Sequence, residues 1–308
     1  MLTLEFVLWS NCPNNCRFCW QRLFDDKTAW LSQDEKVKCL TDCSKKIEQE
    51  ANDCDILLVG GEAYCDQGER ANEKLSEIYN QIAAKIKNGD VRFLYANTNL
   101  TYKERVNLES LFKAFKGIED HLKFTTSYDL DGRFNRLNES ESKNGCAKID
   151  RRGLFLENLK WINDNHPAVN TVVNTIITRA VADAVLKEGY DTHWFIDEFP
   201  NTVNYVNLIP YIPIEGDDAL DVKFSETIKV LEAANKKYPG YFRDYVMMFD
   251  LNQDKLLYEY HSDTGFVERT AGTLPCGHNE NFQRINRSGE CFICKLIEYY
   301  NDNKDRLS

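Results

Sequence analysis

The sequence has no long apolar run and fewer basic than acidic residues, and each of these features argues against a class of function. No stretch approaches the ~20 apolar residues of a membrane-spanning helix, and Met1 leads into strand-like sequence without a basic segment followed by an apolar one. We therefore expect neither a membrane segment nor a signal peptide. Lys and Arg number 38 against 49 Asp and Glu, which gives a net charge of −11. Because phosphate backbones need clustered positive side chains, bulk nucleic-acid binding is disfavoured.

A disulfide framework of the secreted type is also missing. The eleven cysteines are odd in number, and their spacings do not pair into such a framework. We therefore expect a protein of the reducing cytoplasm. In such proteins, a large number of cysteines more often indicates metal binding. The 308 residues, 43% of them hydrophobic, suffice for one large core or for one domain with a small appendix.

Strand-like and helix-like segments alternate from residue 2 to about residue 220. The predicted strands are 2–9, 55–60, 91–95, 121–128, 169–178 and 203–209. The predicted helices are 32–49, 72–87, 103–115, 152–165, 181–199 and 225–237. Six successive strand–helix units predict an α/β fold with a parallel sheet, whose ligand sites lie at the carboxyl ends of the strands. The polar segment 131–150 is predicted as a loop over that end or as a mobile surface loop.

Three cysteines follow the first predicted strand in one loop, Cys12-Pro13-Asn14-Asn15-Cys16-Arg17-Phe18-Cys19. Thiolates are the usual ligands of iron–sulfur clusters. Three of them can bind three irons of a [4Fe–4S] cube, which leaves the fourth iron free for a small molecule. A zinc knuckle needs a fourth ligand nearby, and no His or Cys follows within ten residues of Cys19. From the spacing alone, a zinc site and a chance group of core cysteines remain alternatives.

The loop resembles the cluster-binding motif of the radical S-adenosylmethionine (radical SAM) enzymes, in its C-x3-C-x2-C spacing and in the aromatic residue before the last cysteine. The resemblance implies that Cys12, Cys16 and Cys19 bind a [4Fe–4S] cluster. It implies that the open iron binds the amino and carboxylate groups of S-adenosylmethionine, and that Phe18 packs near the adenine. It also implies a partial (β/α)6 barrel, which fits the six predicted units.

Further residues at strand ends are similar to the family's S-adenosylmethionine site. Gly60-Gly61-Glu62 ends the second predicted strand. Glycines allow a ligand to approach the backbone, and the carboxylate can accept hydrogen bonds from the methionyl ammonium group. By the same resemblance, the other cofactor-binding residues are expected to be Thr98, Ser127, Arg152 (to the carboxylate), Asn174 (near the ribose) and Leu208 (on the adenine).

Two of these positions, Thr98 and Ser127, leave questions open in the sequence. Leu100 stands where related enzymes have a glycine after Thr98-Asn99. Ser127 is explained equally by a strand-end turn built by Asp and Gly. Cys65, three residues after Glu62, is a further candidate for a ligand or a hydrogen donor. The remaining cysteines are expected in the core: Cys39, Cys43, Cys54 and Cys146.

A second cysteine group lies near the C-terminus and resembles the start of the auxiliary-cluster domain of SPASM and twitch radical SAM enzymes. It comprises Cys276, His278, Gly289, Cys291 and Cys294. No cysteine follows, so a full SPASM domain with two extra clusters is excluded. One interpretation is a second [4Fe–4S] cluster on the three cysteines, with the fourth ligand from elsewhere, from His278 or from the substrate. The others are a Cys3His zinc site and plain core cysteines.

We therefore expect a radical SAM barrel over residues 1–220 and a C-terminal extension with an auxiliary metal or cluster site over 221–308. The resemblance implies reductive cleavage of S-adenosylmethionine to methionine and a 5′-deoxyadenosyl radical, which abstracts hydrogen from a substrate. It also implies an external one-electron donor of the flavodoxin or ferredoxin type.

The sequence favours a peptide or protein side chain as the substrate, because of the SPASM-like tail and the stretch around Ser127. The alternative substrate is a small molecule of the nucleotide or modified nucleobase class, as in viperin-like or phage DNA-modifying members. A third interpretation is a binding or regulatory protein with a catalytically silent barrel.

Overall fold

The structure is a computed structural model, and it describes the first two-thirds of the chain most fully. Backbone and side chains are described over 3–9, 12–14, 31–128 and 150–186, and at the single residues 16, 19, 199, 222, 226, 229, 230 and 233. The backbone alone is described at residue 2 and in 203–210, 245–250, 255–261, 266–269 and 282–285. The predicted loop 131–150 lies outside the described residues except for Asp150.

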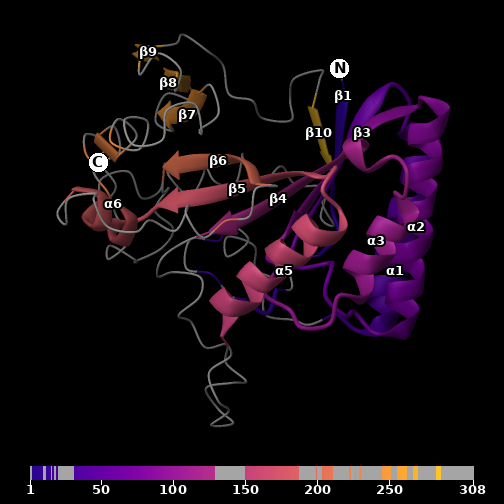
Figure 1. Cartoon of the computed structure of the whole chain (residues 1–308). Helices are drawn as coiled ribbons and strands as arrows, with labels where there is room; N and C mark the ends of the chain where they lie inside the picture. Colours follow the sequence, from indigo (N-terminus) through magenta and orange to yellow (C-terminus); the bar gives the residue numbers. More distant parts are fainter. Residues whose placement is uncertain are drawn as a thin grey trace.

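A sheet of seven parallel strands forms the centre of the molecule, in the order β10–β1–β2–β3–β4–β5–β6 (Figure 1). The strands are β1 (Leu2–Val7), β2 (Cys54–Val59), β3 (Val91–Thr98), β4 (Leu122–Tyr128), β5 (Asn170–Ile177), β6 (Val203–Pro210) and β10 (Phe282–Ile285). From β1 to β6 each strand pairs with the next one in the chain. This order lacks the reversal of a doubly wound sheet, and it is the order of a partial (β/α)6 barrel. The predicted α/β class with a parallel sheet is confirmed, whereas the predicted C-terminal cysteine-containing module stays a prediction.

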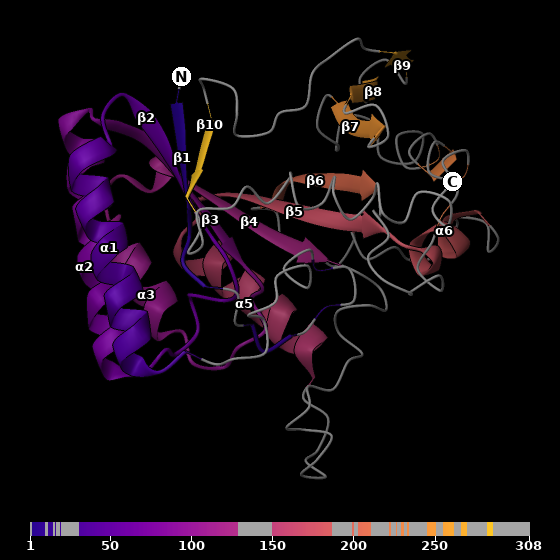
Figure 2. The ribbon, with the colours of Figure 1, turned by 180° about the vertical axis from the view of Figure 1, so that it is seen from behind.

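The connecting helices cover the sheet in the same order as the strands. They are α1 (Gln33–Glu50), α2 (Glu69–Asn88), α3 (Val106–Ala114), the short η2 (Glu119–His121), α5 (Arg151–Asn165) and α6 (Arg179–Leu186). Helix α1 packs against α2, and α2 packs against α3; Figures 1 and 2 show these three helices together beside β1 to β3. The buried side chains of α2 recur at helical spacing, as at Leu75, Ile78 and Ile82, and they join the main core.

The C-terminal third contributes to two sheets. Strands β7 (Tyr245–Asp250), β8 (Lys255–His261) and β9 (Phe266–Arg269) form a separate antiparallel sheet. Strand β10 instead pairs in parallel with β1, with Phe282 opposite Thr3. This pairing was not predicted. It covers the outer edge of β1, whose backbone groups would otherwise lack partners in the sheet. The domain boundary at residue 220 stays a prediction.

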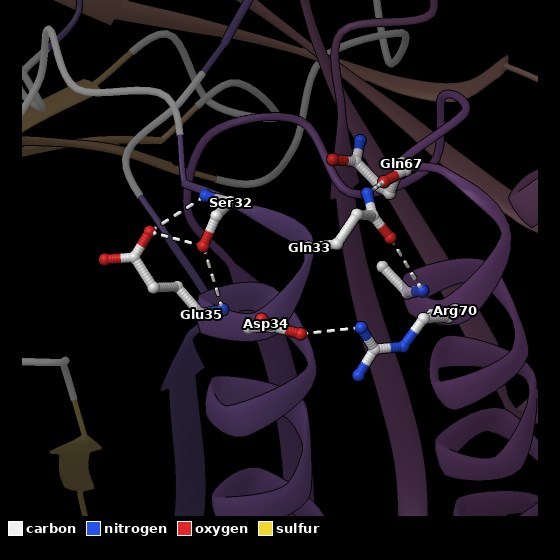
Figure 3. A network of polar contacts seen from close by, with 7 residues as sticks. Ser32, Gln33, Asp34, Glu35, Gln67 and Arg70 are labelled. Atoms are coloured by element: carbon white, nitrogen blue, oxygen red, sulfur yellow. Dashed lines mark hydrogen bonds and ion pairs between the residues drawn. The ribbon is translucent and has the colours of Figure 1, made fainter.

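The start of α1 is fixed by the predicted capping box and by contacts with α2 (Figure 3). The Ser32 backbone N–H donates to the Glu35 carboxylate at 2.8 Å, and the Glu35 N–H donates to the Ser32 hydroxyl at 3.3 Å. Gln33 donates to the backbone oxygen of Gln67, and Arg70 donates to Asp34 at 2.6 Å. These bonds tie the first turn of α1 to the loop between β2 and α2 and to the first turn of α2.

We expect Ser32→Ala to lower the free energy of unfolding by about 1 kcal/mol, because the Glu35 N–H loses its side-chain acceptor. Urea denaturation followed by circular dichroism measures the change. Ser76→Ala, within α2, is the control, since alanine is the better helix former there. Equal stability of the Ser32→Ala variant and the parent protein would contradict the importance of this cap.

Candidate functional site

Residues predicted to share a site meet at the carboxyl ends of β1, β2 and β3. Cys12 follows β1, Glu62 follows β2, and Thr98 is the last residue of β3. These strands are parallel neighbours in register, so their carboxyl ends lie at one edge of the sheet. Asn99 links two of these residues, because its backbone N–H donates to the Glu62 carboxylate and its side-chain amide nitrogen lies 3.4 Å from the Cys12 sulfur.

Gly60 is required by the neighbouring strand. Its φ is +103°, and a Cβ at this position would lie 2.4 Å from the carbonyl oxygen of Trp9 and 3.1 Å from the Trp9 nitrogen. The sequence interpretation assigned the glycine to the approach of a ligand. The structure shows that the backbone at the end of β1 already fills the space that a side chain would need. A contact of Gly60 or Gly61 with a ligand stays a prediction.

We expect Gly60→Ala to lower the free energy of unfolding by about 2–4 kcal/mol, because the new methyl group clashes with backbone and the residue keeps a positive φ. Gly89→Ala is the matched control: Gly89 has a φ of +85° but no atom within 4 Å of its Cβ position. Thermal and urea denaturation of both variants separates the steric clash from the backbone conformation. Equal losses would show that Trp9 imposes no constraint.

Glu62 joins the ends of β2 and β3 from a buried position. Its side chain is 1% exposed. One carboxylate oxygen accepts from the Tyr64 N–H at 2.9 Å, and the Thr98 hydroxyl lies 3.0 and 3.1 Å from the two oxygens. The second oxygen also accepts from the Asn99 N–H. Both oxygens, and the Thr98 hydroxyl, are therefore engaged within the protein, and the predicted contacts of Glu62 and Thr98 with S-adenosylmethionine stay predictions.

Three buried tyrosines surround this carboxylate. The rings of Tyr64 and Tyr79 stack with centroids 6.2 Å apart, and the Tyr102 hydroxyl lies 3.2 Å from the Thr98 hydroxyl. Burial, and then the charge of Glu62, raises the pKa of the Tyr64 phenol well above its usual range. The same two causes raise the pKa of Tyr102. Tyr64 and Tyr102 therefore stay neutral, and all three tyrosines are buried as Glu62 is.

The cysteine loop reaches from β1 to β5. Cys12 and Cys19 are half-buried and Cys16 is buried, and none of the three forms a disulfide. The Cys19 N–H donates to the Cys16 carbonyl at 3.2 Å, and Cys16 packs against Ile176 near the end of β5. Burial, and then the charge of Glu62, raises the pKa of Cys12 to about 12. A bare thiolate is therefore disfavoured, and a positive partner such as a metal is needed to stabilise it.

The donor set of this loop is three thiols. Within the part of the chain that the structure describes, no three His, Cys, Asp or Glu side chains are grouped as they would be around one metal ion. A cubane cluster sets a different requirement, because it binds each cysteine through a different iron. Three thiols on one short loop suit that chemistry. Phe18 lies outside the described residues.

A polar network behind Cys12 was missed by the sequence interpretation. The Asn99 amide nitrogen donates to the Cys12 sulfur at 3.4 Å. The Thr101 hydroxyl donates to the Asn99 side-chain oxygen at 2.9 Å and lies 2.7 Å from the Asn14 side-chain oxygen. The pair Thr98-Asn99 at the end of the third predicted strand could have indicated a role for Asn99, but the prediction used only the threonine.

The predicted residues of β4 and β5 come together at the next part of the edge. Ser127 is opposite Asn174 in the register, and both are half-buried. Leu208 of β6 is opposite Thr175, one residue beyond the row of Ser127 and Asn174. The prediction for the Leu208 side chain falls outside the described side chains.

The arginine predicted at the start of the fourth helix is exposed. Arg152 donates from Nε to the Tyr128 hydroxyl at 3.3 Å. Its neighbour Arg151 is the buried one, at 3% exposure. Helix α5 begins at Arg151, one residue before the predicted start. A contact between Arg152 and a carboxylate ligand stays a prediction.

Cys65 lies beside Glu62, as expected from its place in the sequence. Gln67 donates to the Cys65 sulfur at 3.0 Å and to the Glu62 carbonyl at 2.8 Å. Burial, and then the charges of Glu62 and Cys12, raises the pKa of the Cys65 thiol well above its usual range. Cys65 is therefore a protonated thiol near the cysteine loop, and its catalytic role stays a prediction.

The other cysteines divide into core residues and residues outside the described part. Cys43 and Cys54 are buried, as predicted, whereas Cys39 is half-buried and donates to the Leu8 carbonyl. Cys146, the remaining core candidate, lies outside the described residues. The same is true of the predicted auxiliary site, which comprises Cys276, His278, Cys291 and Cys294.

Comparison with known proteins gives weak structural similarity. No family model matches the chain, and no curated protein matches its sequence. The crystal structure of HydG, a maturase of the [FeFe]-hydrogenase, is similar with a TM-score of 0.42 and 14% identity, over 78% of this chain and 50% of the HydG chain. The chain thus spans about half the length of HydG. A likeness of this degree does not establish a shared activity. Of the helices described, none has the length and apolar composition of a membrane span.

Proposed function

We propose that this chain is a radical SAM enzyme, which binds a [4Fe–4S] cluster on Cys12, Cys16 and Cys19. The observation that carries the proposal is the position of the cysteine loop at the carboxyl edge of a parallel sheet in chain order, where Asn99 contacts both Cys12 and Glu62. Ligand sites of such folds lie at that edge. When bound, the cluster would supply the electron that breaks the sulfonium bond of S-adenosylmethionine.

The residues of the chain itself would hold and shield this site. The packing of Cys16 on Ile176 fixes the loop against β5. The hydrogen bonds of Glu62 to Thr98 and Asn99 hold the edge of β3 in place behind it. The buried tyrosines exclude water from that side, and this protects a reactive intermediate from side reactions.

The cofactor's polar groups would be bound further along the edge. The half-buried Ser127 and Asn174, side by side in the register, suit the ribose hydroxyls. The exposed guanidinium of Arg152 suits the methionyl carboxylate, since a guanidinium binds a carboxylate through two hydrogen bonds. The backbone at Gly60 and Gly61 suits the ammonium group.

We assign the substrate to a peptide or protein side chain, with a small molecule as the alternative. The support comes from the sequence alone, in the SPASM-like cysteines of 276–294 and the stretch that begins at Ser127. The extension 221–308 would carry the auxiliary cluster or zinc. A flavodoxin or ferredoxin would deliver the electron.

The test is anaerobic reconstitution with iron and sulfide, then incubation with dithionite and S-adenosylmethionine. We expect 5′-deoxyadenosine to form. About four irons per chain would indicate one cluster and favour zinc at the C-terminal site, and about eight would indicate two clusters. A reconstituted protein that binds iron but forms no 5′-deoxyadenosine would contradict the enzymatic proposal and favour a binding protein with a silent barrel.

A further inference from the structure

Asn99 presents its side-chain amide to one of the three cysteines. The amide nitrogen lies 3.4 Å from the Cys12 sulfur, within hydrogen-bonding distance for a sulfur acceptor. The asparagine is 8% exposed, so water competes little for this donor. Asn99 follows directly on β3, whereas Cys12 follows β1, so the contact depends on the fold and not on sequence proximity.

The orientation of this amide is set by its other partners. The Asn99 side-chain oxygen accepts from the Thr101 N–H at 2.8 Å and from the Thr101 hydroxyl at 2.9 Å. A backbone N–H can only donate, so the atom that faces it must be the amide oxygen. The NH2 group must then face Cys12. The contact is therefore a donor directed at a sulfur.

The backbone around Asn99 is held just as firmly. Its N–H donates to the buried carboxylate of Glu62. The next residue, Leu100, is fully buried and has a φ of +54°, a conformation that leucine rarely adopts. Asn158 maintains this turn, because its amide donates to the carbonyls of Leu100 and Tyr102, both at 2.9 Å. An unfavourable backbone conformation maintained by its surroundings is frequent at functional sites.

We infer that the Asn99 amide raises the reduction potential of the cluster through its hydrogen bond to Cys12. The inference rests on the function proposed above. Reduction adds one electron from the external donor and makes the cluster and its sulfurs more negative. A hydrogen bond to sulfur stabilises the more negative state more strongly. Asn99 is therefore a positioning residue: it raises the reduction potential of the cluster, so that the external electron donor can reduce it.

The test is the midpoint potential of the reconstituted cluster, measured by redox titration with the electron paramagnetic resonance signal of the reduced state. In Asn99→Ala we expect the equilibrium constant for reduction to fall about tenfold, which corresponds to about 60 mV for a one-electron couple. Asn99→Asp keeps an acceptor for Thr101 but removes the donor and adds a negative charge. We expect its potential to fall further.

Asn158→Ala is the matched control. It removes a buried amide that supports the same turn but does not contact the sulfur. We expect lower stability and a much smaller change of potential than in Asn99→Ala, because Glu62 and Thr101 still hold Asn99. Three results would overturn the inference: unchanged potentials in both Asn99 variants, an increase in either, or an equal shift in Asn158→Ala. Failure of the parent protein to bind a cluster would instead contradict the proposed function, and iron counting before each titration distinguishes the two cases.

Discussion

The Cys16→Ala variant is expected to lose all reductive cleavage of S-adenosylmethionine. Cys16 is the middle one of the three thiols and the most buried, and it packs against Ile176 of β5. With two thiolates left, one further iron of the cube lacks its protein ligand. Formation of 5′-deoxyadenosine by the anaerobically reconstituted variant, measured by liquid chromatography, should fall to the level of a protein-free blank.

Cys43→Ala is the control for this variant. Cys43 is a buried thiol of α1 that belongs to the main core. Its loss should cost some stability through a small cavity but should leave cleavage at the parent level. Undiminished cleavage in Cys16→Ala, or equal loss in both variants, would refute the assignment of the loop.

The Glu62→Gln variant is expected to be less stable by about 2–4 kcal/mol. The substitution keeps the shape of the side chain but replaces one carboxylate oxygen by an NH2 group. Tyr64 N–H donates to one of these oxygens and Asn99 N–H to the other. Either orientation of the amide therefore places a donor against a buried donor. An unsatisfied buried group costs about 1–3 kcal/mol, and the hydrogen bonds to the charged form are lost as well.

Urea denaturation of the protein without cluster measures this loss, which separates stability from cofactor binding. Glu73→Gln, at an exposed position of α2, is the control and should change stability by less than about 0.5 kcal/mol. A Glu62→Gln variant as stable as the control would show that the carboxylate does not connect β2 and β3. The account of how Asn99 is held near Cys12 would then fail too.

Much of the fold could be predicted because its signals are local. Strands β2 and β5 are apolar runs rich in branched residues, as in strands covered on both faces, and the predicted bounds differ from the observed ones by about one residue. The Ser32–Glu35 capping box marks the start of α1 within the sequence itself. By contrast, β10 becomes a strand of the main sheet only because the edge of β1 is free to pair with it. No local pattern carries that information.

The same difference between local and long-range signals applies to the candidate site. The cysteine loop and Gly60-Gly61-Glu62 could be identified in the sequence because each is a short continuous motif. The reason for Gly60 was not found, since it depends on the backbone of Trp9. Asn99 was passed over because the prediction used only the threonine of Thr98-Asn99. Its contact with Cys12 depends on the turn at Leu100, whose φ of +54° no local sequence pattern indicates.

The central claim is that the three cysteines leave one iron of a [4Fe–4S] cluster open for S-adenosylmethionine. A crystal structure of the reconstituted protein with S-adenosylmethionine, grown without oxygen, tests it most directly. We predict that the sulfurs of Cys12, Cys16 and Cys19 bind three different irons and that the amino and carboxylate groups of S-adenosylmethionine bind the fourth. Three sulfurs without iron, or three sulfurs around a single tetrahedral ion, would contradict it.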